Sequence, residues 1–172
     1  MRLNGFGSGR VLHLDRVDRK ILRAVQSNCM LGTDELSNLC DASPSTILRR
    51  LKKMRKAGVI TSEVALVDPK MVGRPLLFIL GVRLERDDAD VAADFTRKLK
   101  ENPAVMQCFL VTGAADYIVH VSAKDMEEYE RFVQSMLISN PHVTMTETNV
   151  VISPLKLGLS VPIDEENLII AN

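Results

Sequence analysis

The residues of this sequence with the clearest chemical pattern are the bases of one short segment. Between Thr46 and Lys56 there are six Lys or Arg residues and no Asp or Glu. A helix that only faces solvent normally mixes both signs, because opposite charges four positions apart stabilise each other. Such a segment either forms a merely solvated surface or has an anionic partner, and the charge run alone leaves both readings open.

The residues around these bases indicate the helix that would carry them. Ser43 is a favourable N-cap, and Pro44 fits the first helical turn, where a missing N–H costs little. Gly58 suits the left-handed residue that often ends a helix. The buried stripe of this helix, at the spacing of one face, is predicted to be Ile47, Leu48, Leu51 and Met54. The bases then lie on the opposite face or on its flanks.

A second helical pattern, over residues 33–40, precedes this helix, and a turn at residues 41–44 separates the two. Two helices joined by a tight turn form a helix-turn-helix, whose second helix enters the major groove of DNA. This arrangement favours double-stranded DNA as the partner. Ser45, Thr46 and Arg49, near the helix start, are placed to contact base edges, and Arg50, Lys52, Lys53 and Lys56 to attract phosphates. The predicted DNA-binding residues are Ser45, Thr46, Arg49, Arg50, Lys52, Lys53 and Lys56.

The charge of the chain divides it into two parts. Residues 1–62 hold 12 Lys or Arg and 5 Asp or Glu, whereas residues 63–172 hold 10 and 17, so that net charges of +7 and −7 cancel. A first helix, with apolar positions from Leu14 to Val25, completes a basic three-helix unit. A basic front half and an acidic rear half predict two modules with different partners.

The rear half follows the order β-α-β-β-α-β. Strands are expected over residues 76–84, 105–111, 117–123 and 143–152, and helices over 87–100 and 126–138, with a further strand over 61–67. This is the order of a ferredoxin-like unit, whose helices cover one face of an antiparallel sheet. The fold class is therefore α+β, with a winged-helix-like helix-turn-helix domain and a ferredoxin-like βαββαβ domain. The uncovered sheet face predicts dimerisation between sheets.

Several classes of protein are excluded by the composition. The three cysteines and three histidines have no metal-ligand spacing, and no nucleophile–base set or phosphate loop is present. We therefore expect no enzyme, no metal and no cofactor. The longest apolar run, from Leu76 to Val82, is too short to cross a membrane, and residues 1–13 lack the apolar core of a signal peptide. Unpaired cysteines predict a reducing cytoplasm, where the protein would associate with the nucleoid.

At this point the sequence resembles the Lrp/AsnC family of transcription regulators. The resemblance rests on LDRVDRKIL at residues 14–22, DASPSTILRRLKKMRKAGVI at residues 41–60 and VTGAADYIV at residues 111–119. It covers nearly the whole chain, from Leu12 to Leu157. It implies a DNA-binding domain followed by a sensor domain that forms homodimers, which assemble to tetramers or octamers. It also implies a small-molecule effector, usually an amino acid, bound between dimers.

The resemblance further implies where that effector binds. The family's GxxD loop corresponds to residues 113–116, where Ala114 replaces an acid that several members carry, and its TxT pattern corresponds to residues 146–148. Glycine allows close backbone approach, and a carboxylate suits an α-ammonium group. The alternative is a loop in which Gly113 turns a hairpin and Asp116 binds loop amides. The implied effector-binding residues are Gly113, Ala114, Asp116, Tyr117, Thr146 and Thr148.

The expected organisation has five parts. These are a flexible leader at 1–12, the helix-turn-helix domain at 13–60, a linker strand and turn at 61–73, the ferredoxin-like effector-binding and oligomerisation domain at 74–153, and a tail at 154–172. The predicted function is sequence-specific transcription regulation that responds to an effector. An architectural nucleoid-type DNA-binding protein with an amino-acid-sensing assembly domain is the alternative.

Overall fold

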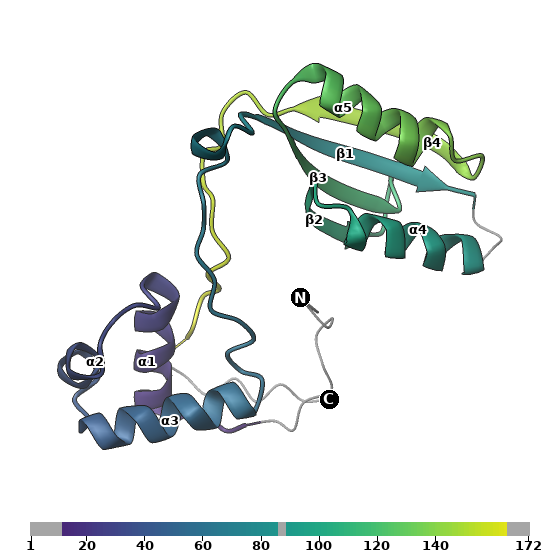
Figure 1. Ribbon diagram of the computed structural model, residues 1–172. Coiled ribbons are helices and arrows are strands. Elements are labelled where there is room, and N and C mark those ends of the chain that lie inside the picture. The colour runs from purple at the N-terminus through teal and green to yellow at the C-terminus, as the bar shows by residue number, and fades with distance from the viewer. Residues whose placement is uncertain (1–11, 86–88, 165–172) are drawn as a thin grey trace. The chain divides into compact units, whose positions relative to one another are not determined.

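The computed structural model describes residues 12–85 and 89–164 of the chain. These residues form two compact units, which Figure 1 shows with the chain running from purple to yellow. Among the described residues, the first unit comprises residues 12–65 together with residues 157–164, and the second lies within Leu66–Lys156. Residues 157–164 thus belong to the same unit as the three helices at the front of the described chain.

The first unit contains α1 (Arg16–Ser27), α2 (Thr33–Cys40) and α3 (Pro44–Lys56). Asp15 and Asp18 form a capping box at the start of α1, in which each side chain accepts a bond from the other's backbone N–H. Ser43 is the N-cap of α3, with Pro44 in its first turn. The start that the sequence predicts for α3 at Ser43 is therefore that of the structure.

The core of this unit lies between the three helices, and its most buried residues are Ile21, Leu36, Cys40, Ile47, Leu51 and Met54. The stripe predicted for α3 is correct at three positions and wrong at Leu48, whose side chain is 55% exposed. Leu48 lies about 100° around the helix from Ile47, so that the narrow core of a three-helix unit does not reach it.

The segment between the units differs from its prediction. Residues 61–68 form no strand in the described structure, although their β-branched sequence predicted one. A strand requires a neighbour to pair its backbone, and the described chain offers none here. The segment is instead fixed at its start by Arg55, which binds Glu63 through two N–H groups, and ends at the short 3-10 helix η1 (Pro69–Val72).

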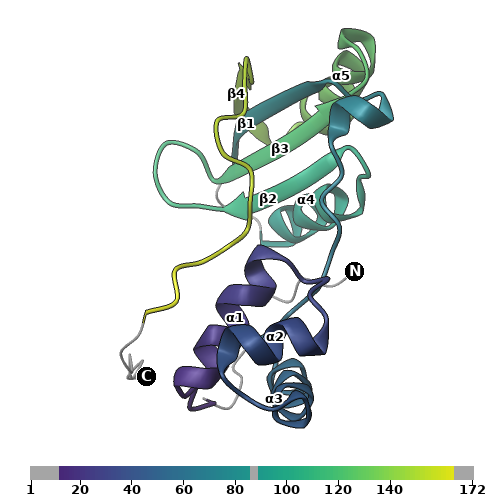
Figure 2. The ribbon, with the colours of Figure 1, turned by 90° about the vertical axis from the view of Figure 1, so that its left-hand side faces the viewer.

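The second unit is an antiparallel sheet of four strands with two helices on one face, as Figure 2 shows from the side. The strands are β1 (Leu76–Leu84), β2 (Val105–Leu110), β3 (Tyr117–Ala123) and β4 (Val143–Val150), in the order β2-β3-β1-β4. The helices are α4 (Ala89–Glu101) and α5 (Met126–Val133), and α5 continues as a π-helical turn, η2 (Gln134–Ile138). Residues 86–88, where α4 was expected to begin, lie outside the described chain.

The core of the second unit joins this sheet to its helices. The ring of Phe78 on β1 stacks on Tyr129 of α5, and Phe95 of α4 meets Tyr117 of β3 edge-on. The opposite face of the sheet carries no helix in the described chain, and its residues include Ile79, Ile118 and His120, each half-exposed. The predicted ferredoxin-like fold is thereby confirmed, including its one uncovered face.

Candidate functional site

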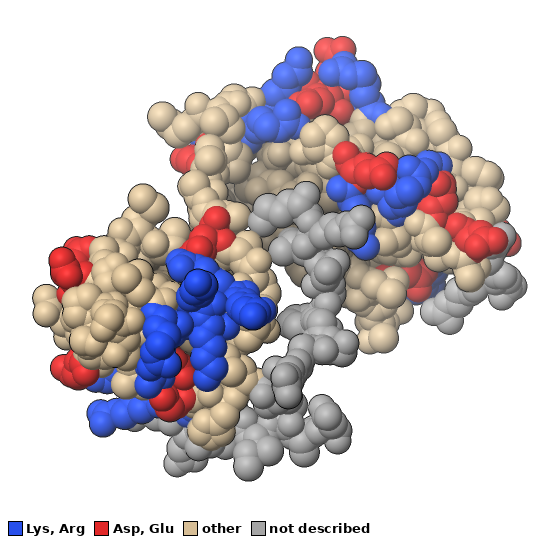
Figure 3. All heavy atoms as spheres, turned by 60° about the horizontal axis from the view of Figure 1, so that its bottom comes forward, with Lys and Arg blue, Asp and Glu red and all other residues tan. Residues whose placement is uncertain are grey.

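The first candidate surface is the outward face of α3. Arg49, Lys52, Lys53 and Lys56 are all exposed. No ion pair ties any of the four to another described residue. Figure 3, viewed from the side on which α3 lies, shows Lys and Arg gathered into one band on the first unit. Cations that the fold leaves unpaired are available for phosphate groups.

The start of α3 carries hydroxyl groups beside these bases. Ser43 Oγ lies 3.1 Å from Ser45 Oγ and 2.9 Å from Thr46 Oγ1. Ser45 is exposed and Thr46 is half-buried. These short polar side chains lie in the first turn of the helix, which is the part of a recognition helix that approaches base edges.

Arg50 has a different environment from the other predicted DNA-binding residues. Its Nη1 donates to Asp15 Oδ2 at 2.6 Å and to Asp18 Oδ1 at 2.8 Å, and its side chain is only 19% exposed. These bonds raise the pKa of Arg50, with the bond to Asp18 contributing most. The pKa of Asp15 is lowered, first by the backbone N–H of Asp18 and then by Arg50. Arg50 therefore joins α3 to the capping box of α1.

The second candidate site is the loop between β2 and β3. Gly113 has φ of 125°, a conformation that favours glycine. Asp116 fixes the loop to the end of β1, because its Oδ2 accepts a bond from the N–H of Leu84 at 3.0 Å and its own N–H donates to Val82. Arg83 also donates to the carbonyl of Ala114. The Asp116 carboxylate thus binds a backbone amide, with one oxygen left for another partner.

The other predicted effector residues lie around the same end of the sheet but are not all directed at the loop. Thr146 is opposite Val82 on β4, so that β1 lies between it and Asp116. Thr148 binds the hydroxyl of Tyr129 at 2.8 Å, and Tyr117 directs its hydroxyl to Thr96 of α4 at 3.0 Å. Gly113, Ala114 and Asp116 are brought together, whereas Thr148 and Tyr117 already have partners inside the unit.

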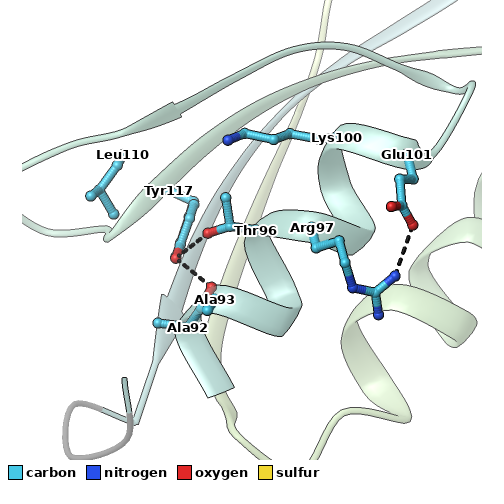
Figure 4. Close-up of a pocket in the computed structure, with 8 residues that line it drawn as sticks. All are labelled: Ala92, Ala93, Thr96, Arg97, Lys100, Glu101, Leu110 and Tyr117. Atoms are coloured by element: carbon cyan, nitrogen blue, oxygen red, sulfur yellow. Dashed lines mark hydrogen bonds and ion pairs between the residues drawn. The ribbon is translucent and has the colours of Figure 1, made fainter. Parts of the chain in front are cut away.

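A hollow of about 560 Å³ lies beside Tyr117, between α4 and the β2 edge of the sheet (Figure 4). Its floor includes the Tyr117 ring, and Lys100 extends over it from α4. Of the predicted effector residues only Tyr117 lines this hollow. The other residues that line it are Ala92, Ala93, Thr96, Arg97, Lys100, Glu101 and Leu110. The sequence did not predict the α4 residues of this hollow, because their contact with Tyr117 depends on tertiary packing. Their spacing along one helix face was the one local feature that could have indicated them.

No group of three or more His, Cys, Asp or Glu is placed to hold a metal ion within residues 12–85 and 89–164. No helix in that part of the chain is both long and apolar enough to span a membrane.

Comparison with known proteins connects both units to characterised domains. Residues 14–61 match a family described as winged helix-turn-helix DNA-binding, and residues 77–161 match the Lrp/AsnC ligand binding domain. An uncharacterized HTH-type transcriptional regulator of Sinorhizobium fredii is 42% identical, over 89% of this chain and 90% of its own length. The leucine-responsive regulatory protein of Haemophilus influenzae is 34% identical, over 83% of this chain and 86% of its own.

The structural comparisons agree with those of the sequence. A transcriptional regulator of Neisseria meningitidis, solved as a complex with L-Met, has a TM-score of 0.82 and 34% identity, covering 87% of this chain and 96% of its own. An AsnC family transcriptional regulator of Agrobacterium tumefaciens has a TM-score of 0.81 and 28% identity, covering 87% and 97%.

Proposed function

This chain belongs to the Lrp/AsnC family of transcriptional regulators, and we propose that α3 reads duplex DNA while the sheet unit binds an amino acid that changes this binding. The single observation that supports the DNA-reading role most is the set of four exposed bases on α3, which no described acid neutralises. Arg49, Ser45 and Thr46 contact base edges, and Lys52, Lys53 and Lys56 contact phosphates. Arg50 acts on DNA binding through the orientation of α3.

The effector is proposed to bind at the loop of residues 113–116. An amino acid needs a partner for its ammonium group and donors for its carboxylate, and Asp116 with the loop backbone offers both. Thr146 lies one strand away and supplies a hydroxyl. Because L-Met is bound by the Neisseria meningitidis regulator, which is 34% identical, methionine is the first candidate to test.

Assembly of several copies is part of this proposal. The uncovered sheet face supports a homodimer, since an exposed apolar face needs a partner and a second copy presents the same surface. A dimer brings two α3 helices, so that two DNA half-sites are expected. Two dimers then form a tetramer, or four dimers an octamer, with the effector between dimers. Such a protein acts at the chromosome and regulates transcription without catalysing a reaction.

A thermal-shift screen of the twenty amino acids tests the effector proposal. A ligand that binds only the native state raises the melting temperature, by an amount that grows with the logarithm of its free concentration relative to its Kd, so one or a few amino acids are expected to raise it. If none does so at millimolar concentration, the sheet unit has another ligand.

Nuclease footprinting on genomic fragments tests the DNA proposal. Discrete protected half-sites are expected, whereas uniform protection of any DNA would favour an architectural nucleoid protein.

A further inference from the structure

Residues 161–164 form an ordered contact with α1 that neither family match assigns. Gln26 pairs with both backbone groups of Val161: its Nε2 donates to the Val161 carbonyl at 3.2 Å, and its Oε1 accepts from the Val161 N–H at 2.8 Å. A side-chain amide that binds both groups of one residue imitates the neighbouring strand of a sheet. Val161 is therefore held through its backbone, independently of its side chain, which is 64% exposed.

Two arginines of α1 continue this contact. Arg23 donates to the carbonyl of Ile163 through Nε at 3.0 Å and Nη2 at 2.7 Å, and Arg19 Nη1 lies 3.4 Å from the carbonyl of Asp164. A forked pair of bonds from a guanidinium fixes the direction of its acceptor as well as its distance. Every one of these bonds is made to the main chain.

The spacing of the partners shows that the contact is continuous. Arg19, Arg23 and Gln26 lie four and three positions apart, which places them along one face of α1. Seven residues of helix rise by about 10.5 Å, and the three steps from Val161 to Asp164 span about 10 Å when extended. The helix face and the extended chain therefore match in length, with the two running in opposite directions.

One side chain adds specificity to these backbone bonds. Ile163 packs against the hydrophobic core of the first unit. The preceding leucines do not share this burial, since Leu157 and Leu159 are 68% and 67% exposed. General hydrophobic collapse would have buried them as well. Pro162 fixes its own φ and restricts Val161 to extended conformations, which prepares the segment for this contact.

The geometry points to residues 157–164 being a strap, a segment that docks on α1 and links the DNA-reading unit to the strand of the proposed effector site. The segment that binds this face of α1 is extended and inserts one apolar residue, Ile163. It belongs to the same chain. The strap follows β4 within seven residues, and β4 carries Thr146 and Thr148. A displacement of β4 by a ligand is thus passed along the chain to α1. The coupling to the effector rests on the proposed function, but the docking does not.

Two truncations of the full chain test the docking. One ends at Ser160 and lacks the docked residues, and its matched control ends at Asp164 and keeps them. Hydrogen exchange of the α1 amides is expected to be about tenfold faster in the shorter protein and unchanged in the control, because local opening becomes easier when a packed segment is removed. Equal exchange rates in α1 for the two proteins would overturn the docking.

A pair of proline variants tests the backbone recognition without shortening the chain. Val161→Pro removes the N–H that Gln26 accepts, whereas Leu159→Pro changes a residue with which Gln26 makes no bond. Faster exchange of α1 is expected only in Val161→Pro. Equal exchange rates of α1 in both variants would contradict the pairing of Gln26 with the backbone of Val161.

The coupling is tested by DNA affinity, measured with and without the amino acid found in the thermal-shift screen. Ile163→Asp is expected to bind DNA and the amino acid as the full-length protein does. Its DNA affinity with the amino acid, divided by its DNA affinity without it, is expected to be close to one. A ratio equal to that of the full-length protein would overturn the coupling. If the full-length protein itself shows no response to any amino acid, the proposed effector function fails, and the exchange measurements still decide the docking.

Discussion

The two units of this protein differ in how much of their proposed site a single chain completes. Four exposed bases of α3, Arg49, Lys52, Lys53 and Lys56, make no ion pair with another described residue, which supports the proposed DNA-reading surface. Around the loop at residues 113–116 the polar groups are already engaged: Asp116 binds the Leu84 amide, Tyr117 binds Thr96, and Thr148 binds Tyr129. Under the proposed function, the DNA-reading surface lies within one chain, whereas the effector site requires a second copy or a ligand.

Removing the unpaired lysines is expected to have the largest effect. The triple variant Lys52→Gln, Lys53→Gln, Lys56→Gln should weaken duplex binding by about a hundredfold and reduce the salt slope of log affinity by roughly 2 to 3, because each phosphate contact contributes about 0.9. Fluorescence anisotropy titrations at several salt concentrations measure both. Lys98→Gln is the matched control, since Lys98 is paired with Asp94 in the other unit. A triple variant that bound DNA as the control does would show that α3 is not the reading helix.

The neighbours Arg49 and Arg50 sharpen the comparison within one helix. Arg50→Met leaves the buried carboxylate of Asp18 without its cation, and should destabilise the first unit by about 2–3 kcal/mol. Arg49→Ala changes an exposed residue and should alter stability by less than about 0.5 kcal/mol. Denaturant unfolding, followed by amide exchange in each unit, measures the stability of the first unit in both variants.

Arg49→Ala should instead lower affinity for a footprinted site more than affinity for random DNA. A variant that weakened both equally would remove Arg49 from base reading.

The sensor is tested by a smaller change at Asp116. Asp116→Asn keeps the size of the side chain but removes the charge, and should weaken amino-acid binding by about tenfold, in the range of one charged hydrogen bond. Calorimetric titration measures this loss, and DNA affinity in the absence of ligand is expected to stay the same. Unchanged ligand affinity would assign Asp116 to the loop structure alone.

The smallest expected effect is on acid stability. The pKa of Asp15 is lower in the folded protein than its ordinary value of about 3.9, so the stability that it contributes is present above that value and is lost as pH falls through the lower one. Below about pH 4 the first unit should therefore become less stable as pH decreases, and the slope should be shallower in Arg50→Met. Thermal unfolding between pH 5 and pH 2.5, a range chosen around that value, measures the slopes. Parallel slopes would mean that Arg50 does not act through Asp15.

The local signals of the sequence predicted much of the fold. Ser43 and Pro44 start α3 because capping depends on neighbours in sequence, and the strands from Leu76 and Tyr117 begin where their apolar patterns do. The errors lie where partners are distant. Arg50 meets acids 32 and 35 residues away, which no local pattern reveals. The chain from residue 61 lacks a strand because pairing needs a neighbour.

The candidate sites were predicted to different degrees for the same reason. On α3 the helix period alone places the bases outward, whereas the surroundings of Thr148 and Tyr117 depend on α5 and α4. The contact between Gln26 and the tail predicted at residues 154–172 spans 135 residues of sequence. Charge patterns and helix periods describe a surface, but a site assembled from several elements requires the packed structure.

The most direct test of this account is a titration of duplex DNA with the full-length protein at two ionic strengths, with and without the amino acid that stabilises it. The account predicts tight binding at low salt, a steep loss of affinity as salt is raised, and a change in affinity when the amino acid is added. Absence of binding at low salt, or binding that neither salt nor any amino acid alters, would contradict it.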